Sequence, residues 1–177
     1  MAITDLSWPH PDATRSRIRL DAVPAELIHA LARGEAHDPR ATPYLAGPDF
    51  EGLWRIRSAQ IAATPADIPW VTRFLVDPDL PTPVGVAGFH GGPDESGMVE
   101  VGYSVDPAWR RRGYARSALE ILIAQAQSHP SVRTIRATIG PDNLASIALV
   151  TAYGFTENGE QWDDEDGREI IYEIAAG

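Results

Sequence analysis

The sequence contains one short segment that could bind a phosphate group through its backbone. This loop joins an expected strand to an expected helix and reads Arg110, Arg111, Arg112, Gly113, Tyr114 and Ala115. The first peptide N–H groups of a helix have no partner within the helix, and the helix dipole makes that end positive. Gly113 can adopt a positive φ angle and leaves room for an anion, while the small Ala115 lets the helix approach a sheet closely. The three arginines add positive charge, so we expect the loop to be able to hold a pyrophosphate.

The sequence of this loop can also be compared with three other loop types. Taken alone, one glycine in a basic turn is also typical of an ordinary helix start. A Walker nucleotide-binding loop is excluded, because no Gly-Lys-Ser/Thr sequence follows Gly113. A dinucleotide fingerprint fits poorly, since the three-glycine spacing and a chain-opening βαβ unit are both lacking.

Two side chains near the loop could accept a proton. Glu100 lies in the middle of an expected strand, where an apolar residue would be the default, and would project from a mostly buried sheet. It is therefore a candidate general base; the alternative is a structural carboxylate that is paired or lies at a solvated edge. His90, at the end of the neighbouring strand, is a second candidate, although a lone histidine at a strand end is more often simply exposed.

The elements that would position these residues change in character along the chain. Alternating or β-branched segments predict strands at residues 15–23, 70–76, 84–90, 98–105, 132–139, 155–161 and 169–174. Apolar residues at helical spacing predict helices at residues 24–34, 49–61, 115–126 and 143–153. The strands from residue 70 to 105 suit an antiparallel meander, whereas the strand–helix–strand segment after residue 98 implies a parallel pair. An acidic turn at residues 163–167 would join the last two strands.

The composition limits the classes of protein that fit. The chain has 177 residues, which suits one domain over residues 1–177, and a formal net charge of −10. It contains no cysteine, which excludes a disulfide framework, a thiolate metal site and a cysteine nucleophile, and fits a reducing cytosol. The acidic surface argues against nucleic-acid binding, though it could attract a cationic acceptor. No apolar run approaches the ~20 residues that span a bilayer and no signal peptide is visible, so we expect a cytoplasmic protein without a membrane partner.

Three motifs in order give the sequence a resemblance to a known family. The loop of residues 110–115 follows the strand Glu100-Val-Gly-Tyr-Ser-Val105 and matches a Gln/Arg-x-x-Gly-x-Gly/Ala pattern. Asn143-Leu-Ala-Ser146 matches Asn-x-x-Ala/Ser at the start of a helix, and Tyr153-Gly154-Phe155 matches a Gly-Phe that ends it. In this combination the sequence resembles the GNAT superfamily of acetyltransferases over residues 84–174, and by element order alone before that.

The resemblance implies a fold and leaves the acceptor open. The fold is α/β, with a central, mixed and mostly antiparallel sheet of about six to seven strands, one splayed parallel pair and about four helices. Glu100-Val-Gly-Tyr followed by Asp106-Pro107 is similar to the branch that includes the N-terminal acetyltransferases of ribosomal proteins. That branch also holds enzymes that act on unrelated amines. Members are frequently dimers, so a homodimer stays open.

The resemblance also implies where acetyl-CoA would bind. Its pantetheine arm would pair with the backbone in a cleft between residues 103–105 and 138–140. Tyr103, Ser104 and Val105 then become cofactor-binding residues, with the backbone around Val105 donating to the thioester carbonyl. The pyrophosphate would lie on the loop formed by Arg110, Arg111, Arg112, Gly113, Tyr114 and Ala115. Asn143 would hold the pantetheine or a bridging water, and Ser146 would either reach the same arm or be an ordinary helix-surface serine.

The implied reaction moves an acetyl group to a primary amine, either a peptide or protein N-terminus or a small amine, by direct attack on the thioester and without a metal. Glu100 is the candidate base. Many members use a tyrosine seven residues after the motif asparagine as the general acid, but Val150 occupies that position. Tyr153 is the catalytic candidate that remains, although packing against the sheet is its commoner role. Val150 favours a second hypothesis, an acyl-CoA-binding sensor or interaction module of the same fold with little turnover.

Overall fold

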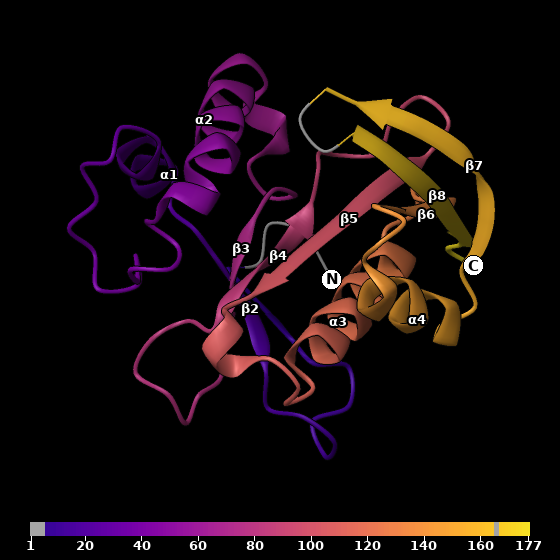
Figure 1. Ribbon diagram of the computed structural model, residues 1–177, viewed down its shortest axis with the longest axis horizontal. Helices are drawn as coiled ribbons and strands as arrows, with labels where there is room; N and C mark the ends of the chain where they lie inside the picture. The colour runs from indigo at the N-terminus through magenta and orange to yellow at the C-terminus, as the bar shows by residue number, and fades with distance from the viewer. Residues whose placement is uncertain (1–5, 165–166) are drawn as a thin grey trace.

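The strands form one mixed sheet that runs through the whole protein (Figure 1). The computed structural model describes residues 6–164 and 167–177, and within these the sheet has eight strands in the order β1-β2-β3-β4-β5-β6-β8-β7. The β5–β6 pair is parallel and the other neighbouring pairs are antiparallel. The strands are β1 (Ser7–Pro9), β2 (Arg19–Ala22), β3 (Arg73–Val76), β4 (Gly85–Phe89), β5 (Met98–Val105), β6 (Thr134–Ile139), β7 (Thr156–Asp163) and β8 (Gly167–Ala175).

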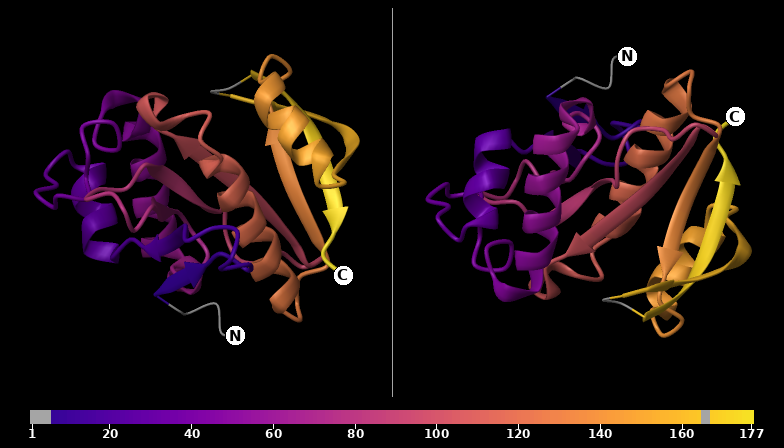
Figure 2. Two further views of the ribbon diagram at one scale, coloured as in Figure 1. Left: turned by 90° about the horizontal axis from the view of Figure 1, so that it is seen from below. Right: turned by 90° about the horizontal axis from the view of Figure 1, so that it is seen from above.

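In the part of the chain that the structure describes, four α-helices cover the two faces of the sheet (Figure 2). They are α1 (Ala25–Ala32), α2 (Pro48–Ala63), α3 (Tyr114–Ser128) and α4 (Leu144–Ala152), with single 3-10 turns at Pro65–Asp67 and Pro107–Trp109. Helices α1 and α2 pack on one face through a buried cluster that includes Trp54 and Phe74. Helices α3 and α4 pack on the other face through a cluster that includes Leu119, Leu122 and Val150.

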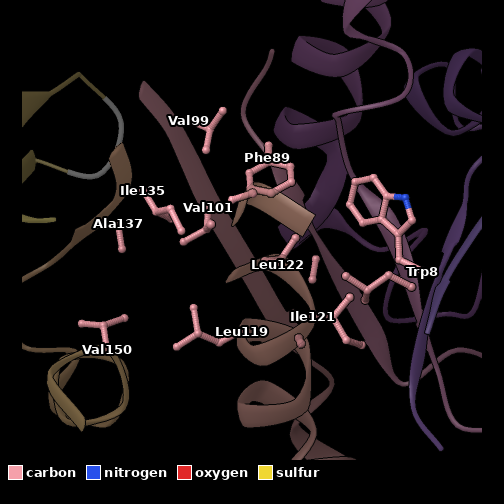
Figure 3. Close-up of a cluster of buried hydrophobic side chains, with 14 of the residues drawn as sticks. Trp8, Phe89, Val99, Val101, Leu119, Ile121, Leu122, Ile135, Ala137 and Val150 are labelled. Carbon is pink, nitrogen blue, oxygen red and sulfur yellow. The ribbon is translucent and has the colours of Figure 1, made fainter. Parts of the chain in front are cut away.

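Side chains alternate along β5 and so separate these two faces. Val99, Val101 and Val105 are buried in the cluster beneath α3, and Figure 3 shows Val99 and Val101 along β5 and Leu119 and Leu122 along α3 in this cluster. Because successive residues of a strand point to opposite faces, the even-numbered residues from 100 to 104 point toward the side of α1 and α2.

Strands β5 and β6 separate soon after they meet. Their parallel pairing joins residues 98–100 to residues 134–136. Beyond these residues β5 pairs with β4 as far as Val105, and β6 pairs with β8 as far as Ile139. The two strands therefore form a V, which Figure 2 shows from two sides, and its open end lies where the chain enters α3 and α4.

The predicted architecture is confirmed, with eight strands in place of six to seven. The additional strand is β1, a three-residue edge strand that ends in a proline and carries no alternating pattern, although its Trp8 is fully buried. The predicted first strand at residues 15–23 shortens to β2. Residues 165–166 of the predicted acidic turn, and residues 1–5 of the segment where no signal peptide was expected, lie outside the described residues. None of the helices within the described residues has the length and apolar character needed to cross a membrane.

Candidate active site

The open end of the V between β5 and β6 is a cleft of about 420 Å³. Its walls come from the two strands, the start of α4 and two further residues: Val101, Gly102, Tyr103, Ala137, Thr138, Ile139, Gly140, Asn143, Ser146, His90 and Glu169. A cleft thus lies where the sequence placed the pantetheine arm, although its lining begins at Val101 and omits Ser104 and Val105.

The backbone of β5 directs alternate peptide groups into this cleft. The His90 N–H donates to the Glu100 carbonyl (2.8 Å), and the Asp106 N–H donates to the Val84 carbonyl (2.9 Å), so the even-numbered residues of β5 bond to β4. The odd-numbered residues Tyr103 and Val105 therefore turn their peptide groups toward β6, which no longer pairs with β5 at that level. Because Arg110 Nε donates to the Val105 carbonyl (2.9 Å), the Val105 N–H is the group that remains for a bound molecule.

Ser104 lies on the other face of β5, and the geometry removes it from the predicted cofactor-binding residues. Its hydroxyl is 2.9 Å from the hydroxyl of Tyr44, on the α2 side of the sheet. Its peptide group faces β4. The prediction failed for Ser104 because it treated three consecutive strand residues alike, whereas the pleat sends neighbouring residues to opposite faces.

The loop between β5 and α3 presents a row of peptide N–H groups. Gly113 is the N-cap of α3 with a φ of 86°, and Arg111 has a φ of 64°. Among the residues that the structure describes, the N–H groups of residues 111–116 have no hydrogen-bond acceptor. Residues 110–113 are exposed, and the Arg112 guanidinium lies over the Trp109 ring at 4.8 Å. An anion can therefore approach these N–H groups from outside.

Two members of the loop turn inward. Tyr114 is buried and its hydroxyl donates to Asp77 Oδ2 (2.7 Å). Burial, together with this bond to a carboxylate, raises the pKa of Tyr114 to about 12. Ala115 packs against the core. Both residues fix the start of α3, and they can offer an anion only their peptide groups.

The same loop also borders a second hollow, of about 520 Å³, on the far side of α3. This hollow lies between α3 and the connection from β1 to β2. Arg112, Gly113 and Tyr114 line it together with the charged residues Arg15, Arg17, Asp77, Asp79, Arg116 and Glu120. The loop therefore borders a hollow that is separate from the cleft.

Asn143 and Ser146 meet at the start of α4, and both line the cleft. The Asn143 side chain caps the helix, because its Oδ1 accepts a hydrogen bond from the Ser146 N–H (3.2 Å). This bond fixes the direction of the asparagine amide. Asn143 is exposed and Ser146 is half-buried, so both can contact a molecule in the cleft.

Glu100 stands where β5 and β6 part. Its carboxylate accepts a hydrogen bond from the Thr138 hydroxyl and lies 3.4 Å from His90 Nδ1, and its side chain is only 17% exposed. The structure thus brings together the two proton acceptors that the sequence suggested, Glu100 and His90. Thr138 was missed as a functional residue, because a contact across 38 positions leaves no local pattern in the sequence.

The imidazole of His90 lies against the backbone of β5. A Cβ atom at Gly102 would come within 2.9 Å of His90 Nε2, so the missing side chain gives the ring its place. Desolvation lowers the pKa of His90; the Glu100 carboxylate opposes this shift and the buried Arg57 adds to it. Arg57 also donates to the His90 carbonyl (3.1 Å). At neutral pH the ring is therefore uncharged and can accept a proton.

A smaller, mostly apolar cavity of about 170 Å³ lies on the α2 side of His90. Its walls are Phe50, Leu53, Arg57, Thr72, Val86, Ala87, Gly88, Phe89, His90, Gly102, Tyr103 and Ser104. It shares His90, Gly102 and Tyr103 with the cleft. His90 therefore lies at the junction of the cleft and this cavity, with the Glu100 carboxylate 3.4 Å from its Nδ1.

Tyr153 does not line the cleft, so the geometry argues against its predicted catalytic role. Its hydroxyl donates to Glu120 of α3, and Glu120 also lies 2.5 Å from His10 Nε2. Burial raises the pKa of Tyr153, and the bond to Glu120 raises it further. Tyr153 therefore ties α4 to α3. Val150 is fully buried and points toward β6 (Figure 3), as a core residue.

Within residues 6–164 and 167–177, no group of three or more His, Cys, Asp or Glu side chains is arranged to hold a metal ion.

The chain matches the acetyltransferase (GNAT) domain over residues 17–156 and therefore belongs to the GNAT family of acetyltransferases. It is 29% identical over 151 residues to the uncharacterised N-acetyltransferase YjdG of Bacillus subtilis, a match that covers 81% of this chain and 88% of that protein.

Solved structures of low sequence identity share the fold. The ribosomal-protein-S5-alanine acetyltransferase of Vibrio fischeri superposes with a TM-score of 0.63 at 18% identity, over 90% of this chain and 93% of that one. The ribosomal L7/L12 α-N-protein acetyltransferase RimL, in complex with coenzyme A, gives a TM-score of 0.62 at 15% identity, over 89% of this chain and 93% of that one.

Proposed function

We propose that this chain binds acetyl-CoA in the cleft between β5 and β6 and transfers the acetyl group to a primary amine that enters from the α2 side. One observation carries the proposal most: His90 lines both the cleft and the apolar cavity, and the Glu100 carboxylate lies 3.4 Å from its Nδ1. A proton acceptor at such a junction can serve an amine on one side while the thioester lies on the other.

The residues present fit coenzyme A. The free N–H groups of residues 111–116 and the exposed arginines suit a pyrophosphate. The unpaired edge of β5 suits an extended amide-containing arm, which would hydrogen-bond to Tyr103 and Val105 as an added strand would. Asn143 would hold that arm from α4. When bound, acetyl-CoA would supply an activated acetyl group, and side chains of this protein would accept the proton of the ammonium group.

The α2 side suits the amine. An alkylammonium ion must lose a proton before its nitrogen can attack a carbonyl carbon, and Glu100 with the uncharged His90 offers two acceptors within 3.4 Å of each other. The Thr138 hydroxyl orients the carboxylate. The Val105 N–H would donate to the carbonyl oxygen as negative charge develops, a contact typically worth ~3–4 kcal/mol.

The acceptor is a peptide or protein N-terminus or a small primary amine. RimL is described as acting on the α-amino group of ribosomal protein L7/L12, and the S5-alanine enzyme is named for another ribosomal protein. These relatives support a peptide acceptor. The small volume of the cavity, about 170 Å³, favours an acceptor whose amine-bearing residue is small.

Thiol release from acetyl-CoA, measured across a panel of small amines and short peptides, tests the proposal. We expect at least one acceptor to raise thiol release above hydrolysis, with the acetylated amine identified by mass spectrometry. Tight CoA binding with no acceleration by any amine would count against transfer and favour a binding module of the same fold.

A further inference from the structure

The cleft lacks the tyrosine that would be expected to protonate the leaving sulfur. Val150 is buried in the core, and the Tyr153 hydroxyl is bound to Glu120. Of the residues that line the cleft, Tyr103, Thr138 and Ser146 carry hydroxyl groups. The Thr138 hydroxyl donates to Glu100, so it holds the carboxylate in place. Within the lining of the cleft, Tyr103 and Ser146 are therefore the two hydroxyl groups that remain to protonate the leaving sulfur.

Resting on the proposed function, we propose that the hydroxyl of Tyr103 is the general acid that protonates the leaving sulfur of acetyl-CoA. Tyr103 comes from β5, whereas the tyrosine expected from the resemblance would come from α4. The active site would thus still use a tyrosine hydroxyl, but this tyrosine would come from the opposite wall of the cleft.

The hydrogen bonding of Tyr103 supports this role. Its hydroxyl oxygen is buried and, among the described residues, has no hydrogen-bond partner of normal geometry. Buried hydroxyl groups are usually paired, so an unpaired one on a residue that lines a cleft points to a partner that arrives with a ligand. By contrast, the hydroxyls of Tyr114 and Tyr153 donate to the carboxylates of Asp77 and Glu120.

The position of Tyr103 also supports its role as the general acid. Tyr103 is odd-numbered, so its side chain lies on the α3–α4 face, where it packs against the core cluster near Ser146. Glu100 and Ser104 project from the other face. A base on the face that receives the amine and an acid on the face that receives the thiol would flank the reacting carbonyl carbon from opposite sides.

The acidity of Tyr103 fits a donor that keeps its proton until the sulfur gains charge. Burial raises the pKa of Tyr103, and the nearby Ser146 hydroxyl partly offsets this shift. The phenol is thus protonated throughout the neutral range. It is also a far stronger acid than the aliphatic hydroxyl of Ser146, which we assign to orienting Tyr103.

The reaction removes two protons from the amine nitrogen and adds one proton to the sulfur. Glu100 or His90 takes one proton from the ammonium group, and the neutral nitrogen forms its bond to the carbonyl carbon. The carbon–sulfur bond then breaks, its electron pair goes to sulfur, and Tyr103 gives its proton to that sulfur. The nitrogen releases a second proton, which returns to the Tyr103 oxygen through the solvent of the cleft. The products are the amide, free CoA thiol and one proton.

Tyr103→Phe tests the proposal, because it keeps the ring that packs against the core and removes only the oxygen. We expect kcat to fall by roughly 100-fold, while the Kd for CoA changes less than about twofold. Tyr153→Phe is the matched control, and we expect its kcat to stay within about twofold of the wild type. In a Tyr103→Phe background, Ser146→Ala should have little further effect. A kcat for Tyr103→Phe within about threefold of the wild type would overturn the proposal.

A second measurement decides the matter even if Tyr103→Phe folds poorly. Replacing Tyr103 by a fluorinated tyrosine lowers the pKa of the phenol with little change in shape. We expect the loss of kcat at high pH to move to lower pH by the same amount. An unmoved profile would contradict a proton-donor role, since a purely structural tyrosine has no influence on that profile. If the wild-type protein itself turns over no amine, the proposed function fails first and independently of Tyr103.

Discussion

The two sides of β5 are built in different ways. On the α3–α4 side, the groups assigned to acetyl-CoA come from short continuous segments, namely the end of β5, the loop at residues 110–116 and the start of α4, and they are largely backbone groups. On the α2 side, the groups assigned to the amine are side chains from three separated segments: His90, Glu100 and Thr138. A site made of backbone groups tolerates changes of side chain, whereas a site made of converging side chains is altered by each substitution.

The largest effect is expected on the α2 side. Glu100→Gln keeps the size of the side chain and removes the charge, so we expect kcat/KM to fall by roughly 100-fold or more with CoA affinity retained. Steady-state kinetics over a range of pH would measure this change. Glu157→Gln, at an exposed position of β7, is the control and should be neutral. Equal kinetics for the two variants would remove Glu100 as the base.

A substitution in the loop between β5 and α3 should affect the CoA side alone. Gly113 has a φ of 86° with open space where a Cβ would lie, so Gly113→Ala costs backbone strain of ~1–2 kcal/mol without a clash. We expect CoA affinity to fall by up to about tenfold in calorimetry, and the midpoint of unfolding to drop.

Gly34 provides the matched control for this experiment. It has a φ of 68°, also with nothing near a Cβ, and it lies after α1, away from the loop. Gly34→Ala should lower stability by a similar amount and leave CoA affinity unchanged. If both variants weaken CoA binding equally, the effect reports stability and the loop has no special role.

Gly102 tests how the two sides are joined. A Cβ at this position would meet His90 Nε2 at 2.9 Å, so Gly102→Ala should displace the imidazole and lower kcat/KM for the amine by about tenfold, a typical share of a general-base contribution. CoA affinity should stay the same. In a His90→Ala background the substitution has no ring to displace, so Gly102→Ala should then add little. A full additional loss in the double variant would show that Gly102 acts in another way.

The two sides of β5 also differ in how much of each could be predicted from the sequence. The loop and the Asn143 cap could be predicted because each is a local arrangement of consecutive residues with its own backbone geometry. The contacts of Glu100 with Thr138 and of Gly102 with His90 could not, because they depend on strand register across the sheet.

For two residues, Ser104 and Tyr153, the geometry argues against the role that the sequence suggested. Ser104 was grouped with Tyr103 and Val105 although the pleat turns it to the other face. Tyr153 was predicted as the last residue of the helix at residues 143–153, but it is the C-cap of α4, with φ −96° and ψ 11°, and has left helical geometry. Extrapolating a 3.6-residue period to the last residue of a helix therefore misplaced its hydroxyl.

The smallest effect concerns pH and stability. The pKa of His90 is lowered on folding, so the folded protein binds fewer protons than the unfolded chain between that pKa and the usual value of about 6.5. The contribution of His90 to stability is therefore complete above that value and is lost as the pH falls below it. Since 47% of the side chain is exposed, the change will be small. Urea unfolding between pH 7.5 and 5.5 should show a shallower pH dependence for His90→Gln, and an identical slope would argue against the lowered pKa.

A crystal structure with bound CoA is the most direct test of the central claim that the donor lies on the α3–α4 side and the acceptor on the α2 side. We expect the pyrophosphate on the N–H groups of residues 111–116, the pantetheine arm along Tyr103 and Val105, and the sulfur beside the Tyr103 hydroxyl. Pantetheine running instead into the hollow beside Arg15 and Arg17, on the far side of α3, would contradict it.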